Sequence, residues 1–122
     1  KAAFVLCKEF SQGMVSKKWG RIVNIASSSA YAGFKNTSIY CSSKHALLGL
    51  SRSLHSELKE HNVRTFCVSP GSIKTPMGKS VVGQSYETFL NPSEVAELIV
   101  RLISFDSEMI SQEIQLHRMN QQ

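Results

Sequence analysis

The hydrophobic residues of the first part of the chain follow two different patterns. Residues 1–18 have a helical spacing of apolar side chains and predict a helix, weakened at Gly13. The stripe expected to face the core consists of Ala3, Cys7, Phe10 and Met14. Residues 21–26 form a short run rich in isoleucine and valine, which predicts a buried strand.

A second helix and strand follow in the same order. Residues 27–38 are small and polar and predict a loop, after which residues 39–60 predict a long helix and residues 63–68 a strand. The helix prediction depends on a stripe of leucines at positions Leu47, Leu50, Leu54 and Leu58. Two strands joined by a helix in one sheet run parallel with a right-handed crossover.

Turn and cap residues mark the last elements. The dipeptide Pro70-Gly71 is expected to end the second strand. Asn91 is a suitable cap and Pro92 a suitable first residue for a helix that runs to about residue 103. Residues 109–117 are a candidate for a last strand. The alternation as a whole predicts an α/β protein with a doubly wound parallel sheet.

Composition narrows the function classes. A chain of 122 residues, 42% of them hydrophobic, can bury one core, and nothing in it indicates a second domain. The net charge is +5, but basic residues are scattered among acidic ones, so we expect no nucleic-acid interface. No apolar stretch approaches the ~20 residues that span a bilayer and no signal-peptide pattern opens the chain, so we expect a cytoplasmic protein without membrane contact.

Neither the cysteines nor the histidines have the spacing of a metal site. The three cysteines form no C-x-x-C pair, so we expect reduced thiols and no disulfide framework. Cys7 and Cys67 lie on apolar faces and are expected in the core. Cys41 follows Tyr40, but neighbours on a helix point about 100° apart, so we expect no direct catalytic role for it. We predict no metal ligands in this chain.

Three residues indicate an enzyme active site: Ser27, Tyr40 and Lys44. Tyr40 and Lys44 stand at positions i and i+4 near the start of a predicted helix and therefore share a face. A cation held beside a phenol favours the phenolate, which makes a proton donor and acceptor. Each residue also has an ordinary alternative: a strand-end serine that bonds the backbone, a helix-start tyrosine and a solvated lysine.

Three motifs surround these residues in a fixed order. They read GRIVNIAS at residues 20–27, YCSSK at residues 40–44 and VSPGSIKT at residues 68–75. In order and spacing they resemble the C-terminal half of the short-chain dehydrogenase/reductase family, whose domain is a Rossmann-like, doubly wound parallel sheet. The resemblance extends from about residue 1 to residue 114.

The resemblance implies an oxidoreductase that transfers hydride between NAD or NADP and a carbonyl or alcohol substrate. Ser27 would bond the carbonyl oxygen and Tyr40 would protonate it. Lys44 would assist Tyr40 and bond the nicotinamide ribose, so Tyr40 and Lys44 also count as cofactor residues. Substrate contacts are expected from Ser27, Tyr40 and Tyr31, which lies in the loop after the serine.

The turn after the second strand would close over the nicotinamide. The resemblance implies cofactor contacts there for Pro70, Gly71, Ile73 and Thr75. The ordinary alternative is that the Pro-Gly pair only stops a strand and Thr75 only caps a turn. The segment between this turn and Pro92 is shorter than the lid of many family members, which predicts an open pocket. We expect a 3-oxoacyl-carrier-protein-reductase-like enzyme or a general carbonyl reductase.

The N-terminal half of the family has no counterpart in this sequence. No G-x-G-x-x-G turn for the cofactor pyrophosphate occurs, so we interpret residues 1–122 as a partial domain and expect it to be inactive in isolation. The family implies a homodimer or homotetramer through helices 1–18 and 39–60. The alternative is an inactive fragment that acts as a self-association module, aided by the open edge of strand 22–26.

Overall fold

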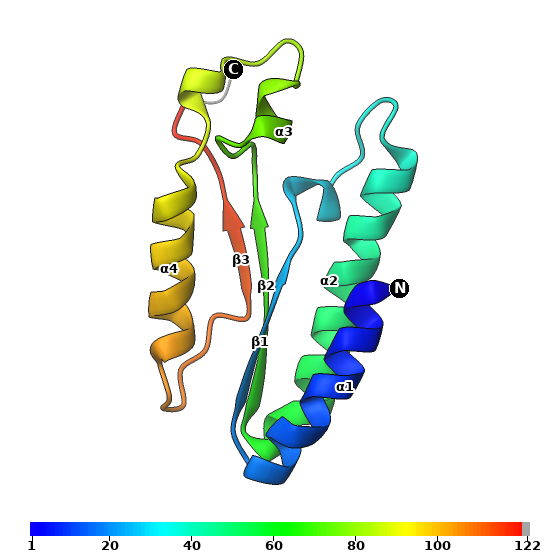
Figure 1. Cartoon of the computed structure of the whole chain (residues 1–122), viewed down its shortest axis with the longest axis vertical. Coiled ribbons are helices and arrows are strands. Elements are labelled where there is room, and N and C mark those ends of the chain that lie inside the picture. The colour runs from blue at the N-terminus through cyan, green and yellow to red at the C-terminus, as the bar shows by residue number, and fades with distance from the viewer. Residues whose placement is uncertain (121–122) are drawn as a thin grey trace.

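The fold is a three-stranded parallel sheet with helices on both faces (Figure 1). The computed structural model describes residues 1–120. The strands, in their order across the sheet, are β1 (Gly20–Ile25), β2 (Val63–Pro70) and β3 (Glu113–Leu116). All three point toward the same end of the molecule, so their carboxyl ends form one edge (Figure 1). The predicted parallel α/β architecture is confirmed.

Two helices cover one face of the sheet and one helix covers the other (Figure 1). The longer helices are α1 (Ala2–Lys17), α2 (Ser38–Leu58) and α4 (Pro92–Ser104). The loops contain short elements: η1 (Ser28–Ala30), η2 (Lys59–His61), α3 (Pro76–Lys79) and η3 (Tyr86–Thr88). Helices α1 and α2 contact β1 and β2, while α4 lies across the opposite face.

Strand β2 supplies the centre of the core because both of its faces are covered. Val63 is fully buried in a cluster with Cys7 and Ile22, beneath α1 and α2. Alternation along the strand places Phe66 and Val68 on the α4 face, where each is 1% exposed. A strand covered on both sides explains the nearly continuous apolar run that predicted it.

Some predicted boundaries differ from the structure. Strand β2 ends at Pro70, which confirms the predicted stop at Pro70-Gly71 and places the strand end two residues beyond the predicted range of 63–68. The amide of Gly71 still donates to the carbonyl of Leu116 at 2.9 Å. Strand β3 is shorter than predicted, because the carbonyls of Ser107 and Met109 accept hydrogen bonds from the Arg64 side chain instead of from a strand.

Helix boundaries follow the cap residues. The cap at Asn91 is confirmed, since its side chain accepts a hydrogen bond from the Ser93 amide at 2.9 Å. Helix α1 runs through Gly13 without a break.

One residue of the predicted helix faces needs correction. On α1, Cys7 is buried as predicted, but Phe10 is 66% exposed and Ser11 is the other buried residue of the helix. The Ser11 hydroxyl donates to the Lys8 carbonyl at 3.1 Å, so this polar group is satisfied inside its own helix. On α2 the predicted leucine stripe faces the core, since Leu47, Leu54 and Leu58 are partly buried and pack against the core clusters, and Leu48, outside that stripe, is the most buried leucine.

A buried polar contact joins β1 to α2. The Asn24 side-chain amide donates to the Ser51 hydroxyl at 2.9 Å, and the Ser51 hydroxyl donates to the Leu47 carbonyl at the same distance. The Cys7 thiol lies 3.7 Å from the Asn24 side-chain oxygen. Because a buried polar group without a partner is costly, these bonds define how α1 and α2 sit on the sheet.

Removing the largest fully buried side chain should destabilise the protein strongly. Phe66→Ala leaves a cavity and should lower the free energy of unfolding by about 3–5 kcal/mol. The control is Val82→Ala, at a side chain that is 95% exposed, which should change stability by less than about 0.5 kcal/mol. Urea denaturation measures both values, and equal effects of the two variants would contradict this description of the core.

Candidate active site

Tyr40 and Lys44 meet beside the end of β1. Both lie in the first two turns of α2, on the same face of the helix. The Lys44 ammonium donates to the carbonyl of Ile25 at 3.2 Å and lies 5.6 Å from the centre of the Tyr40 ring. Ile25 is the last residue of β1 and Ser27 follows it closely, so the three predicted catalytic residues gather at one edge of the sheet.

Ser27 stands where the strand becomes a tight turn. The amide of Ala26 donates to the Val68 carbonyl at 2.8 Å, which extends the β1–β2 pairing up to the serine. Ser27 has extended backbone geometry and caps η1, and its side-chain oxygen accepts from the Ser29 amide at 3.1 Å. The ordinary strand-end role is therefore present, but a hydroxyl that accepts one bond still has its hydrogen to donate.

Tyr40 faces outward while its neighbour faces the interior. The Tyr40 side chain is 44% exposed, whereas Cys41 is 7% exposed. The Cys41 sulfur lies 3.0 Å from the Thr37 hydroxyl, and this hydrogen bond lowers the pKa of the thiol. The phenol is thus the accessible group at the start of α2.

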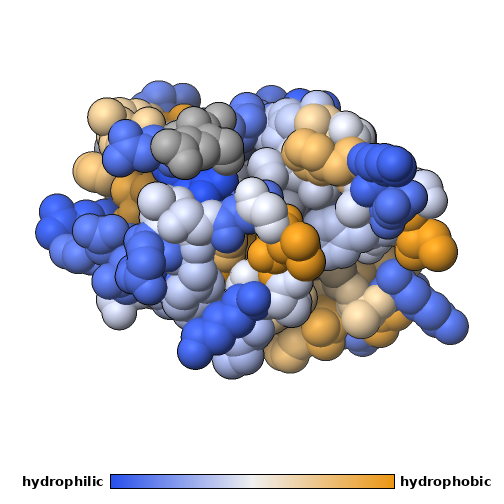
Figure 2. Space-filling view, turned by 90° about the horizontal axis from the view of Figure 1, so that it is seen from above, coloured by the Kyte–Doolittle hydropathy of each residue, from blue (hydrophilic) through white to orange (hydrophobic). Residues whose placement is uncertain are grey.

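A groove beside α2 contains the lysine of the trio. It has a volume of about 500 Å³ and lies between the start of α1 and the adjoining turns of α2. Its lining residues are Lys1, Ala2, Ala3, Phe4, Ser43, Lys44, Ala46, Leu47 and Leu50. Figure 2 looks onto the end of the molecule that carries the strand ends, where hydrophobic residues are set among hydrophilic ones.

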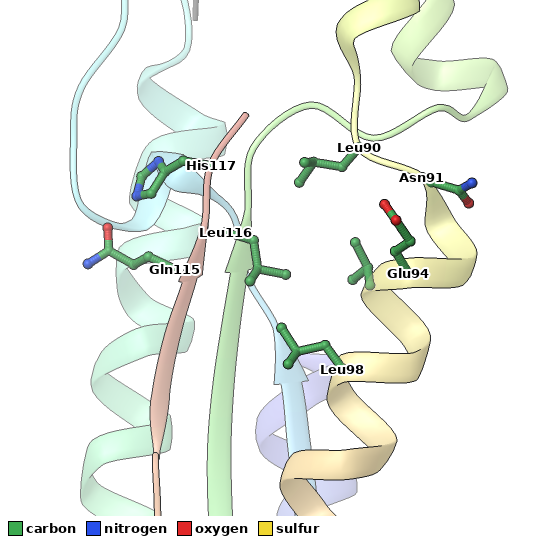
Figure 3. Close-up of a pocket in the computed structure, with 8 residues that line it drawn as sticks. Leu90, Asn91, Glu94, Leu98, Gln115, Leu116 and His117 are labelled. Atoms are coloured by element: carbon green, nitrogen blue, oxygen red, sulfur yellow. The ribbon is translucent and has the colours of Figure 1, made fainter. Parts of the chain in front are cut away.

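A smaller cavity, of about 220 Å³, lies on the other face of the sheet between β3 and α4. Leu90, Leu98 and Leu116 point into it, with the Glu94 carboxylate at one side (Figure 3). None of the predicted site residues lines this cavity. It is therefore separate from the trio.

The turn after β2 forms a hydrogen-bonded segment at the same edge as the trio. It begins with Gly71, directly after Pro70 at the end of β2, and Ile73 forms an isolated parallel bridge with Leu90. The Thr75 hydroxyl accepts from the Gly78 amide at 3.0 Å and so caps α3, which confirms the ordinary role considered for it. The four cofactor residues predicted here thus lie at the carboxyl end of β2: Pro70 ends the strand, and Gly71, Ile73 and Thr75 follow it.

Tyr31 makes a contact that the sequence did not predict. Its hydroxyl donates to a Glu113 carboxylate oxygen at 2.9 Å, and its ring packs against the buried cluster that includes Ala30 and Leu48. Burial, followed by the neighbouring carboxylate, raises the pKa of Tyr31 to about 12. As a residue of a substrate pocket Tyr31 would therefore offer its ring, since its hydroxyl is already bonded.

Glu113 also pairs with an arginine of α2. The Arg52 Nε donates to Glu113 Oε2 at 2.7 Å and the Arg52 Nη2 donates to Oε1 at 2.9 Å. This pairing lowers the pKa of the Glu113 carboxyl. The sequence analysis did not single out Arg52 or Glu113. The one signal for this pair was the acidic residue Glu113 in the short strand β3.

Residues 1–120 contain neither a metal-binding cluster nor a helix suited to span a membrane. In that part of the chain no three histidine, cysteine, aspartate or glutamate side chains form a group that could hold a metal ion. None of the helices there has both the length and the apolar character to cross a membrane. The cysteines are free and buried, which confirms the core placement predicted for Cys7 and Cys67.

Comparison with known proteins gives a consistent family match. The family model described as short chain dehydrogenase matches residues 1–85. Carbonyl reductase family member 4 of Xenopus laevis is 35% identical over 103 residues, which cover 80% of this chain and 44% of that protein. The 3-oxoacyl-[acyl-carrier-protein] reductase FabG of Rickettsia prowazekii is 31% identical over 120 residues, covering 91% of this chain and 50% of that protein.

Solved structures show the same fold. A beta-ketoacyl-[ACP] reductase (FabG) from Bacteroides thetaiotaomicron matches with a TM-score of 0.80 and 28% identity, over 95% of this chain and 49% of that one. A putative NAD(P)-dependent gluconate 5-dehydrogenase from Beutenbergia cavernae, with bound NADP, matches with a TM-score of 0.82 and 28% identity, over 93% of this chain and 51% of that one. The chain spans about half the length of these relatives.

The Tyr31 contact should make stability depend on alkaline pH. The folded state holds the phenol proton more tightly than the unfolded state, so this stabilisation is present below pH 10.0 and is lost as the pH rises toward about 12. The difference in free energy of unfolding between wild type and Tyr31→Phe should therefore shrink over that interval. Urea denaturation at a series of pH values measures it.

A second variant separates the two causes of this shift. Glu113→Gln should lower the pKa of Tyr31, measured by phenolate absorbance, but leave it above 10.0, because burial is the larger cause. An unchanged titration in Glu113→Gln, or a pH-independent difference in Tyr31→Phe, would show that the contact is absent in solution.

Proposed function

The chain belongs to the short-chain dehydrogenase family, and we propose that it carries the catalytic half of an NAD(P)-dependent oxidoreductase acting on a carbonyl or alcohol substrate. One observation carries the proposal: the Lys44 ammonium is anchored to the carbonyl of Ile25 and lies beside the Tyr40 ring. This anchoring gathers a cation, a phenol and the strand-end Ser27 at the carboxyl edge of a parallel sheet. In open α/β sheets that edge is where ligands bind.

The residues at this edge fit the nicotinamide end of a dinucleotide. Lys44 offers ammonium hydrogens to the ribose hydroxyls, and the segment after β2 offers backbone groups and a hydroxyl to the carboxamide. The residues concerned are Pro70, which ends β2, and Gly71, Ile73 and Thr75, which follow it. When bound, NAD or NADP supplies or accepts the hydride. The NADP-bound structure of the Beutenbergia cavernae relative supports this choice of cofactor.

Each catalytic side chain has a separate task. Ser27 donates its hydroxyl hydrogen to the substrate carbonyl oxygen and stabilises the negative charge that develops there. Tyr40 gives its phenolic proton to that oxygen during reduction and takes it back during oxidation. The Lys44 charge stabilises the phenolate that remains, because it lies beside the ring.

We propose a 3-oxoacyl-carrier-protein-reductase-like or general carbonyl reductase activity. The relatives named as a carbonyl reductase and as 3-oxoacyl-[acyl-carrier-protein] reductases support this choice. An accessible Tyr40, 44% exposed, is compatible with an open pocket that admits a substrate attached to a carrier.

Removing the phenolic hydroxyl should abolish turnover without abolishing cofactor binding. In the intact native protein, Tyr40→Phe should lower kcat for carbonyl reduction by roughly 10²- to 10⁴-fold, because only the proton donor is lost. Titration of NAD(P)H fluorescence should give a nearly unchanged Kd. Turnover close to that of wild type would contradict the assignment of Tyr40.

A pair of lysine variants provides the matched control for this test. Lys44→Ala should impair both turnover and cofactor binding, because it removes a charge beside Tyr40 and a donor to the ribose. Lys59→Ala removes the same kind of side chain at the other end of α2 and should leave both properties unchanged. Equal effects of the two substitutions would mean that Lys44 has no special role.

We also propose that the chain self-associates through α1 and α2, as a homodimer or homotetramer, in addition to its catalytic role. Helix α1 supports this proposal because large apolar side chains lie on its outer surface. Leu6 and Phe10 are one turn apart and are 54% and 66% exposed. A contiguous apolar strip of this kind on a surface helix marks an interaction site.

Making this strip polar should weaken self-association. The double variant Leu6→Gln/Phe10→Gln should shift the intact protein toward smaller species in sedimentation velocity, since the apolar surface that drives association is removed. Val82→Gln, a similar change at a side chain 95% exposed elsewhere, should leave the distribution as it is. An unchanged distribution in the double variant would exclude this strip as the interface.

A further inference from the structure

Glu113 is bonded to two elements that carry the proposed catalytic residues. Its carboxylate accepts one hydrogen bond from Tyr31, which ends η1, and two from Arg52 on α2. The donors are separated from Glu113 by 82 and 61 residues in sequence. A single side chain of β3 therefore ties the turn after β1 to helix α2.

The path from Tyr31 back to Ser27 is short and rigid. The amide of Ala30 donates to the Ser27 carbonyl at 2.9 Å and the amide of Tyr31 donates to the Ser28 carbonyl at 3.1 Å. The Ser27 side chain is itself bonded to the Ser29 amide. Because consecutive residues of this turn are bonded to one another, a displacement of Tyr31 moves the serine as well.

The path from Arg52 back to Tyr40 runs along a single helix. Arg52 lies twelve residues after Tyr40, which is roughly 18 Å at 1.5 Å per residue. Helix α2 has no break over this distance, so the position of Arg52 relative to the sheet determines the position of its first turns. Lys44 lies between the two residues on the same helix.

We propose that Glu113 is a positioning residue that holds the catalytic serine at a fixed distance from α2, and so from Tyr40 and Lys44. This inference rests on the function proposed above for the trio. Catalysis is sensitive to such a distance, since a misplacement of about 1 Å can cost about 100-fold in rate.

The ion pair between Arg52 and Glu113 is expected to contribute little to the stability of the folded protein. The Arg52 side chain is 56% exposed, and ion pairs in contact with water contribute little to folding. Another pair has the same length: Arg101 donates to Glu97 at 2.7 Å on α4. That pair is remote from the trio and provides a matched control.

The first experiment compares kinetics in the intact native protein. Glu113→Ala should lower kcat for carbonyl reduction by about 10- to 100-fold and leave the KM for NAD(P)H within about twofold, because only the serine is displaced. Glu97→Ala should leave both constants unchanged. Thermal melting checks that the variants are folded. Glu113→Gln provides a second test: it keeps the shape of the side chain and an acceptor for Tyr31, so its loss of kcat should be smaller than that of Glu113→Ala.

The decisive measurement is a double-mutant cycle with Ser27. If Glu113 acts through the serine, Glu113→Ala should lower kcat by less than about twofold when Ser27 is already alanine. An equal fall in both backgrounds would overturn the positioning role while leaving the proposed function intact. If Glu113→Ala lowers kcat in neither background, the positioning role is overturned as well. Absence of reductase activity in the unaltered protein would instead overturn the proposed function, and this inference with it.

Discussion

β1 and β2 pair in parallel from Gly20 with Val63 to Ile25 with Val68, and this pairing determines where the chemistry of the chain lies. Because the strands run in the same direction, the chain must return along the sheet between them, and α2 is that return. The start of α2 therefore lies beside the carboxyl end of β1. That placement allows the Lys44 ammonium, which lies beside the Tyr40 ring, to reach the Ile25 carbonyl at the end of β1.

The rotation of α2 about its axis depends on polar contacts in the core. A helix held only by apolar side chains can turn by a fraction of a residue at small cost, but the bond between Asn24 and Ser51 is satisfied in one orientation. With Ser51 facing the sheet, Lys44 reaches the end of β1 and lines the groove between α1 and α2. The ion pair of Arg52 with Glu113 ties the same helix to β3.

Sequence patterns predicted the parts of this molecule that depend on neighbouring residues. The strand-helix-strand order and the Tyr40–Lys44 pair follow from local spacing. Within the predicted stripe of α1, Cys7 was right and Phe10 was wrong, because the buried face of the helix contains Ser11, a polar residue satisfied within its own helix. The contact of Tyr31 with Glu113 was unpredictable from one sequence, because it joins residues 82 positions apart and depends on strand order.

Rigidity and chemistry are divided between neighbouring strands. The largest fully buried side chains all belong to β2, whereas Ser27, the proposed catalytic serine, follows β1, which has one unpaired edge in the part of the sheet described. The two strands remain bonded up to the Ala26 amide and the Val68 carbonyl, immediately before Ser27. The serine is thus attached to the most buried strand by the last bond of the ladder, while the Tyr40 side chain at the start of α2 is 44% exposed. A site of this kind combines a fixed position with access.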